Sequence, residues 1–421
     1  MVSTSGWNKW SLGKLVSETK TTIQTGPFGT VLSASEFVDY GIPVVSVREI
    51  REGFIRITDE TPCVTEETFS RLSKYSLSEK DIVFARKGSV DRSALIPGGR
   101  RKYFLGSDGI RIRFDQDAVV PELMLYIFQS PSTKQFLVQS AYGTTMAGLN
   151  EKILCSLEFY LPNTVTEQRD IAHILKDIDK QLVVIAEMID KKKTIKQGAM
   201  QELLTGKKRL PGFSGEWQTF SFGALFDFIP NNAFTRAQMA DSGKVKNIHY
   251  GDILTKYGAY VDGDSGAIPY ITKEIDLARF AERCYLQSGD IIIADTAEDE
   301  TVGKALEVIN VDCPILAGQH TLLCRPKIKF AEKFLGYYLN AACYHDQLIP
   351  YIVGTKVSSV SKASVAQTKL VVPGYEEQQA IAEILSNMDA EIEALQQKLE
   401  KYRQLKQGMM QQLLTGKIRL V

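Results

Sequence analysis

Two long stretches of the chain carry apolar residues at alternating intervals of three and four positions, the seam of an amphipathic helix that pairs with another helix. Each stretch predicts about 40 helical residues, or roughly 60 Å of helix. Thr164 and Glu167 have capping-box spacing at one start, Gly374 takes the N-cap place at the other, and Gly206 and Gly416 stand where glycine ends a helix. The expected interface residues are Leu175, Ile178, Leu182, Ile185 and Ile189 in the first stretch, and Leu385, Met388, Ile392, Leu395, Leu399 and Tyr402 in the second.

The rest of the chain has a different pattern of apolar residues. Short β-branched runs, such as 42–47 and 81–84, are bounded by Gly, Pro, Asp and Ser, and this pattern is typical of strands and turns. Helical stretches are expected at 121–139 and 331–347. The fold class is therefore predicted to be α+β, with mixed α/β globular parts.

The chain contains an internal duplication. Residues 167–210 align without a gap with residues 377–420, and 20 of the 44 positions are identical. The same offset of 210 matches Trp7 with Trp217 near the start of each half, whereas the interiors diverge. Two domains with a shared frame and different interiors are expected to do the same work on different targets.

A helix of this length cannot bury its apolar stripe on one small domain, and the repeat supplies a partner of equal length. We expect an intramolecular antiparallel coiled coil with pseudo-twofold symmetry. Two helices packed separately on their own domains, or a parallel pair between two chains, are the alternatives. The predicted domains are 1–162 (globular), 163–210 (central helical spacer), 211–373 (globular) and 374–421 (C-terminal helical spacer).

Composition narrows the functional classes. Fifty Lys and Arg balance fifty Asp and Glu. This balance argues against a protein that binds nucleic acid through its net positive charge alone. The chain has neither an apolar run of membrane-spanning length nor a signal-peptide core, so a cytoplasmic location is expected. Six scattered cysteines and four scattered histidines show no metal-ligand spacing, and no metal site is predicted.

Local charge is more informative than the total. Residues 86–113 carry eight Lys and Arg against Asp91 and Asp108, on turn-like sequence that suits DNA phosphates and guanine edges. Residues 142–150 and 353–362 are matching polar loops. Their side chains could contact DNA, and they are equally typical of an ordinary Ser/Thr turn. The candidate DNA-binding residues are Arg48, Arg86, Lys87, Ser89, Arg92, Arg100, Arg101, Lys102, Thr144, Thr145 and Asn150 in the first half, and Lys273, Thr296, Lys304, Lys356, Ser358, Ser359 and Lys362 in the second.

Catalytic signatures are missing from the sequence. It has no phosphate-binding GxxxxGK[ST] loop, no GxSxG elbow, and no methyltransferase cofactor turn with an Asn/Asp-Pro-Pro-aromatic motif. We therefore predict a chain that is not an enzyme. A coiled-coil adaptor with two protein- or ligand-binding heads would explain the duplication as well as a DNA-binding protein does.

The two copies of the form EQxxIAxIL…KQGxMQxLLTGKxRL, each after a divergent globular part, resemble the specificity subunit of type I restriction–modification systems. The resemblance covers essentially the whole chain. It implies that each globular part is a target recognition domain for one half of a bipartite, asymmetric double-stranded DNA sequence, and that the helices set the spacer. It also implies two methyltransferase subunits and two motor-nuclease subunits as partners, which would hold the S-adenosylmethionine, ATP and Mg²⁺ that this chain itself does not bind. The second globular part, at net −3, departs from the expectation of a basic DNA binder.

Overall fold

The computed structural model describes residues 6–29, 31–142, 148–299, 301–354 and 356–420. The chain divides into two compact units. Unit 1 comprises Met1–Ala186 and Lys398–Val421, and unit 2 comprises Glu187–Gln397. Each unit holds one globular part and a portion of both long helices, α6 (Val165–Leu203) and α12 (Tyr375–Leu413). The mixed fold with two repeated domains predicted from the sequence is confirmed.

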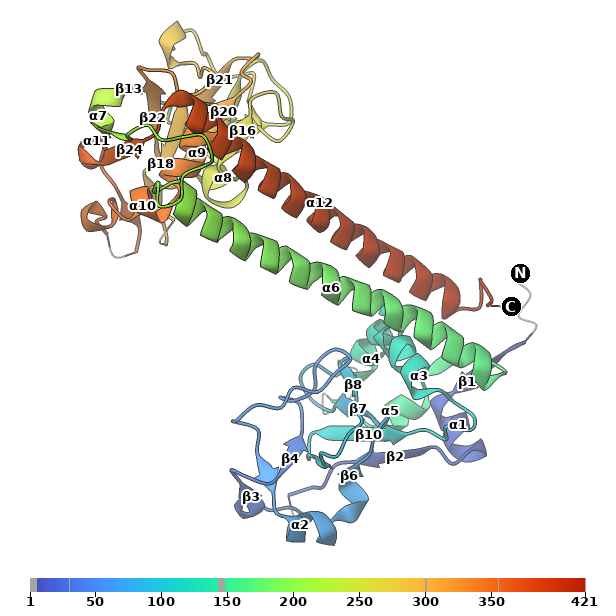
Figure 1. The fold of residues 1–421 in the computed structure, drawn as a ribbon. Helices are drawn as coiled ribbons and strands as arrows, with labels where there is room; N and C mark the ends of the chain where they lie inside the picture. Colours follow the sequence, from blue (N-terminus) through green and yellow to red (C-terminus); the bar gives the residue numbers. More distant parts are fainter. Residues whose placement is uncertain (1–5, 30, 143–147, 300, 355, 421) are drawn as a thin grey trace. The chain divides into compact units, whose positions relative to one another are not determined.

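The globular part of unit 1 is built on two small sheets (Figure 1). One has the order β2-β10-β7-β8, all antiparallel, and the other has the order β3-β5-β4-β9-β6, in which β4 and β9 run parallel. The strands are β1 (Trp7–Ser11), β2 (Thr22–Thr25), β3 (Phe37–Val38), β4 (Ile42–Val45), β5 (Cys63–Val64), β6 (Ser76–Leu77), β7 (Ile82–Ala85), β8 (Ser93–Leu95), β9 (Tyr103–Leu105), β10 (Gly109–Arg113) and β11 (Glu158–Pro162).

Helices cover these sheets and link them to α6. The expected helix over 121–139 is two helices, because Pro131 disfavours the helical conformation at Ser130, which is extended at ψ 145°. The helices before α6 are α1 (Leu12–Glu18), α2 (Glu66–Arg71), α3 (Pro121–Gln129), α4 (Pro131–Tyr142) and α5 (Glu151–Cys155), with 3₁₀ turns η1 (Ala34–Glu36) and η2 (Ser73–Tyr75).

Unit 2 repeats this plan with more strands. Its larger sheet has the order β13-β22-β18-β20-β16, and a second has the order β14-β17-β15-β21. The strands are β12 (Gln218–Ser221), β13 (Phe226–Ile229), β14 (Met239–Ala240), β15 (Lys246–Ile248), β16 (Tyr260–Asp262), β17 (Tyr270–Ile271), β18 (Ile291–Ala294), β19 (Thr296–Ala297), β20 (Ala305–Ile309), β21 (Ile315–Ala317), β22 (Thr321–Pro326), β23 (Ser358–Ser359) and β24 (Lys369–Val372).

The helices of unit 2 before α12 are short. In place of the single stretch expected over 331–347, the chain forms α9 and α10 with Asn340 between them, and the Asn340 side chain binds the backbone of Ala305 through both its oxygen and its nitrogen. The helices are α7 (Phe222–Leu225), α8 (Tyr250–Thr255), α9 (Phe334–Leu339), α10 (Ala342–His345) and α11 (Lys362–Gln367), with η3 (Arg236–Gln238), η4 (Glu282–Cys284) and η5 (Ile349–Tyr351).

The long helices contribute to the core of both units. Ile171 and Leu175 of α6 join the core of unit 1 together with Leu413 of α12. In unit 2 the contributions are exchanged, with Ile381 and Leu385 of α12 beside Leu203 of α6. Each globular part is therefore fused to the start of the helix that follows it and packs on the end of the other. No helix in the described residues is long and apolar enough to cross a membrane.

Both helices end as the repeated glycines predict. Gly206 and Gly416 adopt φ of +68° and +69°, in the left-handed region that favours glycine. A Cβ at Gly206 would also meet the ring of Trp217 at 3.3 Å, and one at Gly416 would meet Trp7 at 3.0 Å. The capping box expected at Thr164 is only half formed. Thr164 Oγ1 accepts from the Glu167 amide at 3.3 Å, but the Glu167 carboxylate binds Trp7 and Arg419 instead.

Candidate nucleic-acid interface

Two loops singled out by the sequence meet at one end of strand β7 in unit 1. The amide of Leu149, in the polar loop before α5, donates a 2.8 Å hydrogen bond to the carbonyl of Arg86, which follows β7. Asn150 caps α5 by accepting from the Ile153 amide at 2.9 Å. Thr144 and Thr145 of the same loop lie outside the described residues. The basic turn 86–92 therefore lies beside the described end of this loop, residues 148–150.

Unit 2 has the same junction at the end of strand β18. The amide of Val360 donates a 2.9 Å hydrogen bond to the carbonyl of Asp295, the position that corresponds to Arg86. Next to it, β19 and β23 pair so that Thr296 lies opposite Ser359, with Ser358 adjacent. The structure therefore brings Thr296, Ser358 and Ser359 together, at the place where unit 1 has its basic turn.

A third segment joins this end of each unit. The sequence marked Asp108 only as an acid within the basic stretch 86–113 and did not mark His320. The amide of Arg86 donates to the carbonyl of Asp108 at 2.8 Å, and the amide of Asp295 donates to the carbonyl of His320 at 3.1 Å. Asp108 also forms a 3.2 Å ion pair with Lys87. His320 has φ +56° and lies in the turn before β22. Only the strand pairing brings these turns to the surface, so no local sequence signal marks them.

Aromatic side chains flank the same ends. In unit 1 the ring of Phe28, 57% exposed, lies 5.1 Å from the guanidinium of Arg86. In unit 2 the ring of Tyr250 lies 5.2 Å from that of His320 and 4.6 Å from that of His249. Burial lowers the pKa of His249, whose Nδ1 accepts from the Gly251 amide. The sequence marks Phe28 only by its place before Gly29, and its exposure becomes known from the structure alone.

The basic segment 86–113 is not a single basic surface. Arg111 is 7% exposed and donates to the carbonyls of Lys74 and Ser76, and Arg113 forms a 2.7 Å ion pair with the buried Asp81. Both arginines are therefore parts of the fold, and the charge count over the segment overstated the number of outward-facing cations.

Residues 100–102 lie at the opposite end of the β7–β8 pair from Arg86. Leu95 pairs with Ile82, so the chain leaves β8 beside the start of β7. There Lys102 forms an ion pair with Glu66 at 2.7 Å, and Arg101 lies over the ring of Tyr103. The predicted cluster is thus divided between the two ends, and only Arg86, Lys87, Ser89 and Arg92 accompany the polar loop.

Lys304 is the one candidate whose charged group is used inside the fold. Its Nζ donates to the carbonyls of Leu254 at 3.1 Å and Tyr257 at 2.9 Å, and burial lowers its pKa. The ammonium therefore holds the end of α8, and a contact of Lys304 with DNA stays a prediction. Of the remaining candidates, Arg48, Arg100, Lys273, Lys356 and Lys362 are exposed, and Lys362 lies over the ring of Phe228.

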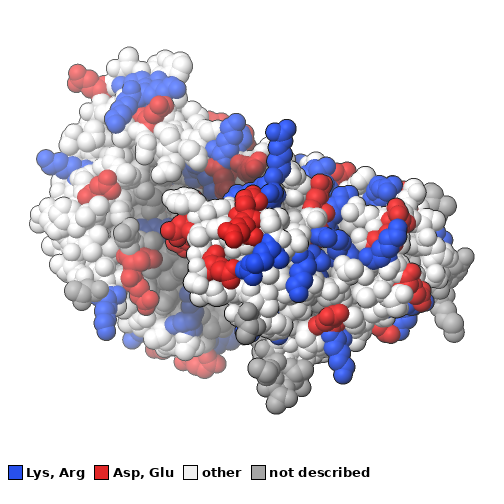
Figure 2. All heavy atoms as spheres, turned by 90° about the horizontal axis from the view of Figure 1, so that it is seen from below, with Lys and Arg blue, Asp and Glu red and all other residues white. Residues whose placement is uncertain are grey.

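The face of the molecule drawn in Figure 2 does not carry charges of a single sign. On the face drawn in Figure 2, Lys and Arg side chains alternate with Asp and Glu. Across residues 6–29, 31–142, 148–299, 301–354 and 356–420, no group of three or more His, Cys, Asp or Glu side chains is placed to hold a metal ion.

The helix seam has a polar contact that recurs in both units. In unit 1, Lys406 of α12 forms an ion pair with Asp179 of α6 at 2.6 Å. In unit 2, Lys196 of α6 forms the equivalent pair with Asp389 of α12 at 2.5 Å, and Lys192 pairs with Glu391. In unit 2, rising numbers on α6 therefore meet falling numbers on α12. In unit 1 the pairs of Glu167 with Arg419 and of Asp179 with Lys406 run the same way, so the helices are antiparallel within each unit.

The expected apolar interface residues lie at buried or half-buried positions. Whether each one contacts the opposite helix stays a prediction. The buried ones are Leu175, Ile178, Ile185, Ile189, Leu385 and Ile392, and the half-buried ones are Leu182, Met388, Leu395, Leu399 and Tyr402.

Known proteins are similar to this chain in sequence and in fold. The sequence model of the type I restriction modification DNA specificity domain matches residues 27–197 and 214–402. The chain is 25% identical over 404 residues to the type I restriction enzyme MjaVIII specificity subunit of Methanocaldococcus jannaschii, covering 90% of this chain and 86% of that protein.

Solved structures agree on the fold. The crystal structure of the type I restriction-modification system S subunit from M. genitalium superposes with a TM-score of 0.55 at 14% identity, covering 97% of this chain and 96% of the other. A chain from a study of complex assembly and conformational transition of the type I R-M system superposes with a TM-score of 0.60 at 16% identity and covers 98% of both chains. Because the family match is duplicated and spans most of the sequence, the chain belongs to the type I restriction–modification DNA specificity family.

Proposed function

We propose that residues 1–162 and 211–373 are target recognition domains, each of which reads one half of a bipartite, asymmetric double-stranded DNA target. The observation that carries this proposal is the repeated junction at the ends of β7 and β18. Leu149 is bonded to Arg86 in one unit and Val360 to Asp295 in the other, so the backbone frame is conserved within the chain.

The side chains on this shared frame differ in chemistry. Unit 1 presents Arg86, Lys87 and Asp108 where unit 2 presents Asp295, Thr296 and His320. Arginine and lysine suit guanine edges and phosphates, whereas carboxylates accept from cytosine amino groups and hydroxyls contact either partner. Two half-sites of different sequence follow from this difference.

Residues 163–210 and 374–421 act as the spacer in this proposal. Helices α6 and α12 each have 39 residues, which corresponds to roughly 58 Å at 1.5 Å per residue. The Lys–Asp pairs fix the register of the two helices within each unit. A fixed register and a rigid length set the number of base pairs that lie unread between the half-sites.

Catalysis belongs to other subunits of the complex, since specificity subunits are its non-catalytic component. In this proposal, two methyltransferase subunits dock on the chain and two motor-nuclease subunits complete the cytoplasmic complex. S-adenosylmethionine, ATP and Mg²⁺ then bind to those partners. The net charge of zero fits this arrangement, because the partners would supply much of the phosphate contact that drives DNA affinity.

A methylation map tests the proposal. The chain is co-expressed with a candidate methyltransferase subunit in a host without adenine methylation, and modified adenines are located by genome sequencing. A split asymmetric motif that vanishes without this chain is the expected result. A stable complex with the partner that adds no methylation would contradict the reading role.

A further inference from the structure

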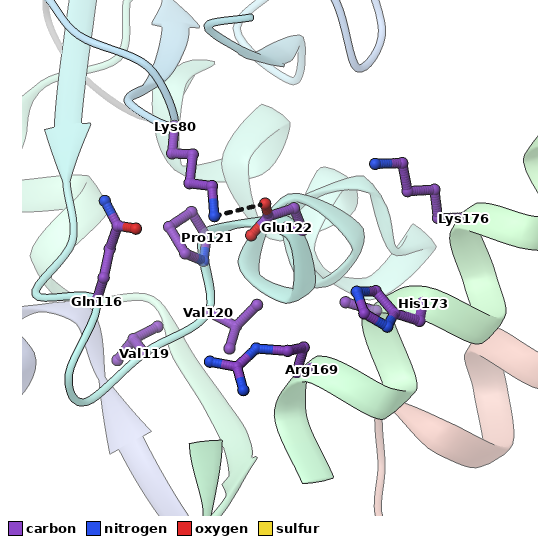
Figure 3. A pocket seen from close by; sticks show the side chains of 10 residues that line it. Lys80, Gln116, Val119, Val120, Pro121, Glu122, Arg169, His173 and Lys176 are labelled. Atoms are coloured by element: carbon purple, nitrogen blue, oxygen red, sulfur yellow. Dashed lines mark ion pairs between the residues drawn. The ribbon is translucent and has the colours of Figure 1, made fainter. Parts of the chain in front are cut away.

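A pocket of about 190 Å³ opens in unit 1 where the start of α6 meets the globular part (Figure 3). Its walls come from three segments, namely the turn before β7, the loop that leads into α3, and α6 itself. The polar side chains that line it are Lys80, Gln116, Glu122, Arg169, His173 and Lys176, above a floor that includes Val119, Val120 and Ala172.

The pocket carries a surplus of positive charge. Glu122 is its one carboxylate and forms a 3.2 Å ion pair with Lys80. Among the described residues, the side chains of Arg169, His173 and Lys176 form neither an ion pair nor a hydrogen bond. On α6, Asp170 follows Arg169 and Asp177 follows Lys176, and Asp177 pairs with Lys180 at 2.7 Å. Arg169, His173 and Lys176 are exposed and have donors to spare, so the pocket suits a carboxylate or another oxyanion that accepts charge-assisted hydrogen bonds.

Lys80 occupies a backbone position that favours glycine. Its φ is +68°, and the corresponding residue of unit 2, just before Asp290, is Gly289 with φ +91°. Residues other than glycine are disfavoured at such a φ. Unit 1 nevertheless places a lysine at this position, and its ammonium lies at the pocket wall (Figure 3).

The repeat supplies an internal comparison. At the offset of 210, Arg169, His173 and Lys176 correspond to Gln379, Glu383 and Ser386 of α12. With histidine neutral, these three positions carry +2 in unit 1 and −1 in unit 2. All three lie off the apolar seam, whose neighbours Ile171 and Leu175 match Ile381 and Leu385. Pairing of the helices therefore does not require the difference.

We propose that this pocket is a docking socket for an acidic side chain of the methyltransferase subunit, present in unit 1 and absent from the corresponding face of unit 2. The proposal rests on the proposed function, in which two copies of that subunit bind the two repeats. Identical partners then meet unlike faces, and the copy on unit 1 binds more tightly.

A DNA phosphate is a poorer occupant than a protein carboxylate. The pocket includes Lys80, which precedes β7, whereas the proposed reading surface begins at Arg86, which follows it. The four residues of β7 alone separate the two by about 13 Å. The reading loops therefore leave this end of unit 1 to a partner.

The test is a titration of the full-length chain with the methyltransferase subunit, followed by native mass spectrometry and calorimetry. Two binding steps are expected, with affinities that differ about tenfold beyond the statistical ratio for identical sites. The variant R169Q/H173E/K176S gives α6 the residues of α12, and the two steps should then converge. The matched control K191Q/K193E makes the same change of −3 in charge at two exposed cations of α6 outside the pocket and should leave the steps unequal.

Each other outcome decides against the socket. Equal steps in the native chain, or unequal steps that R169Q/H173E/K176S leaves unchanged, overturn it while the proposed function stands. The socket is equally overturned if the variant lowers DNA affinity and leaves the partner titration unchanged, since the pocket then holds a phosphate. If no complex forms at all, the proposed function fails and the socket fails with it.

Discussion

The phenol of Tyr126 donates a 2.8 Å hydrogen bond to the carboxylate of Asp179 and so joins helix α3 of unit 1 to helix α6. Lys406 of α12 binds the other oxygen of the same carboxylate at 2.6 Å and lies over the ring of Tyr126. Unit 2 repeats the arrangement with Tyr337, Asp389 and Lys196. One carboxylate in each unit therefore connects the globular part to both helices.

Replacement of Tyr126 by Phe should loosen this junction. Burial, followed by the hydrogen bond to Asp179, raises the pKa of Tyr126, so the phenol keeps its proton and remains the donor. Loss of the donor is expected to cost about 1 kcal/mol in the free energy of unfolding. Hydrogen exchange should rise in α3 and in the first half of α6.

The matched control for this junction is Tyr40→Phe. Because Tyr40 is 91% exposed, loss of its hydroxyl should leave the free energy of unfolding unchanged. Tyr337→Phe should produce the same loosening in α9 and the first half of α12. Unchanged exchange in both units would show that the junction is held by apolar packing alone.

Two triple variants separate the ends of the β7–β8 pair. R86A/K87A/R92A should weaken DNA binding by the complex. It should also lower the magnitude of the slope of log affinity against log salt concentration, by the amount that corresponds to the loss of about one to three phosphate contacts. R100A/R101A/K102A removes the same charge from the end where Lys102 is paired with Glu66, and should change the slope much less. An equal loss of DNA affinity in both variants would show that DNA lies along the whole length of the β7–β8 strand pair.

The duplication made much of the fold predictable. Glu167 and Glu377, or Gly206 and Gly416, stand at matching places in both copies, and a long apolar seam is a local, periodic signal. The roles of individual charges depend instead on contacts far along the chain. Arg111 and Lys304 are indistinguishable from surface cations in the sequence, yet both donate to backbone carbonyls inside the fold.

The candidate site was predicted less completely than the fold, for the same reason. The sequence marked the loops at Arg86 and Asn150 by their charge and polarity, and the structure joins them. The turns at Asp108 and His320 reach the surface only because β10 and β22 pair with β7 and β18. Register between distant strands decides that placement, and a single sequence does not report it.

A buried carboxyl should make the stability of unit 2 depend on pH. Glu307 is 2% exposed, and burial raises its pKa to about 7 although the amides of Lys333 and Gly336 donate to it. Between about pH 4.5 and 7 the folded state holds a proton that the unfolded state has released, so stability falls as the pH rises. The stability fully present below pH 4.5 is lost by about pH 7, up to about 3 kcal/mol.

The variant Glu307→Gln isolates this effect. Its free energy of unfolding, measured in denaturant across pH 4 to 8, should lack the decline, and the difference from the native chain should be largest above pH 7. A difference that does not vary with pH would mean that the Glu307 carboxyl has the same pKa in the folded and unfolded states.

Exchange of residues 211–373 for the corresponding domain of another specificity subunit should change one half of the methylated motif and leave the other half and the spacer unaltered. The reason is that the reading loops of each unit are bonded within that unit, as Val360 is to Asp295. Methylation mapping reads the outcome directly. A motif altered in both halves would show that the two domains do not read independently.

Lengthening both helices by one heptad tests the spacer. Insertion of seven residues after Ala186 in α6 and after Gln397 in α12 keeps the apolar seam in phase and adds about 10 Å of helix. The half-sites should stay the same and the unread segment should grow by up to about three base pairs, at 3.4 Å for each. Insertion into α6 alone is the control, because it sets the two helices out of register with each other and should abolish methylation. A complex that carries both insertions and still methylates the original spacing would show that the helices do not measure the DNA.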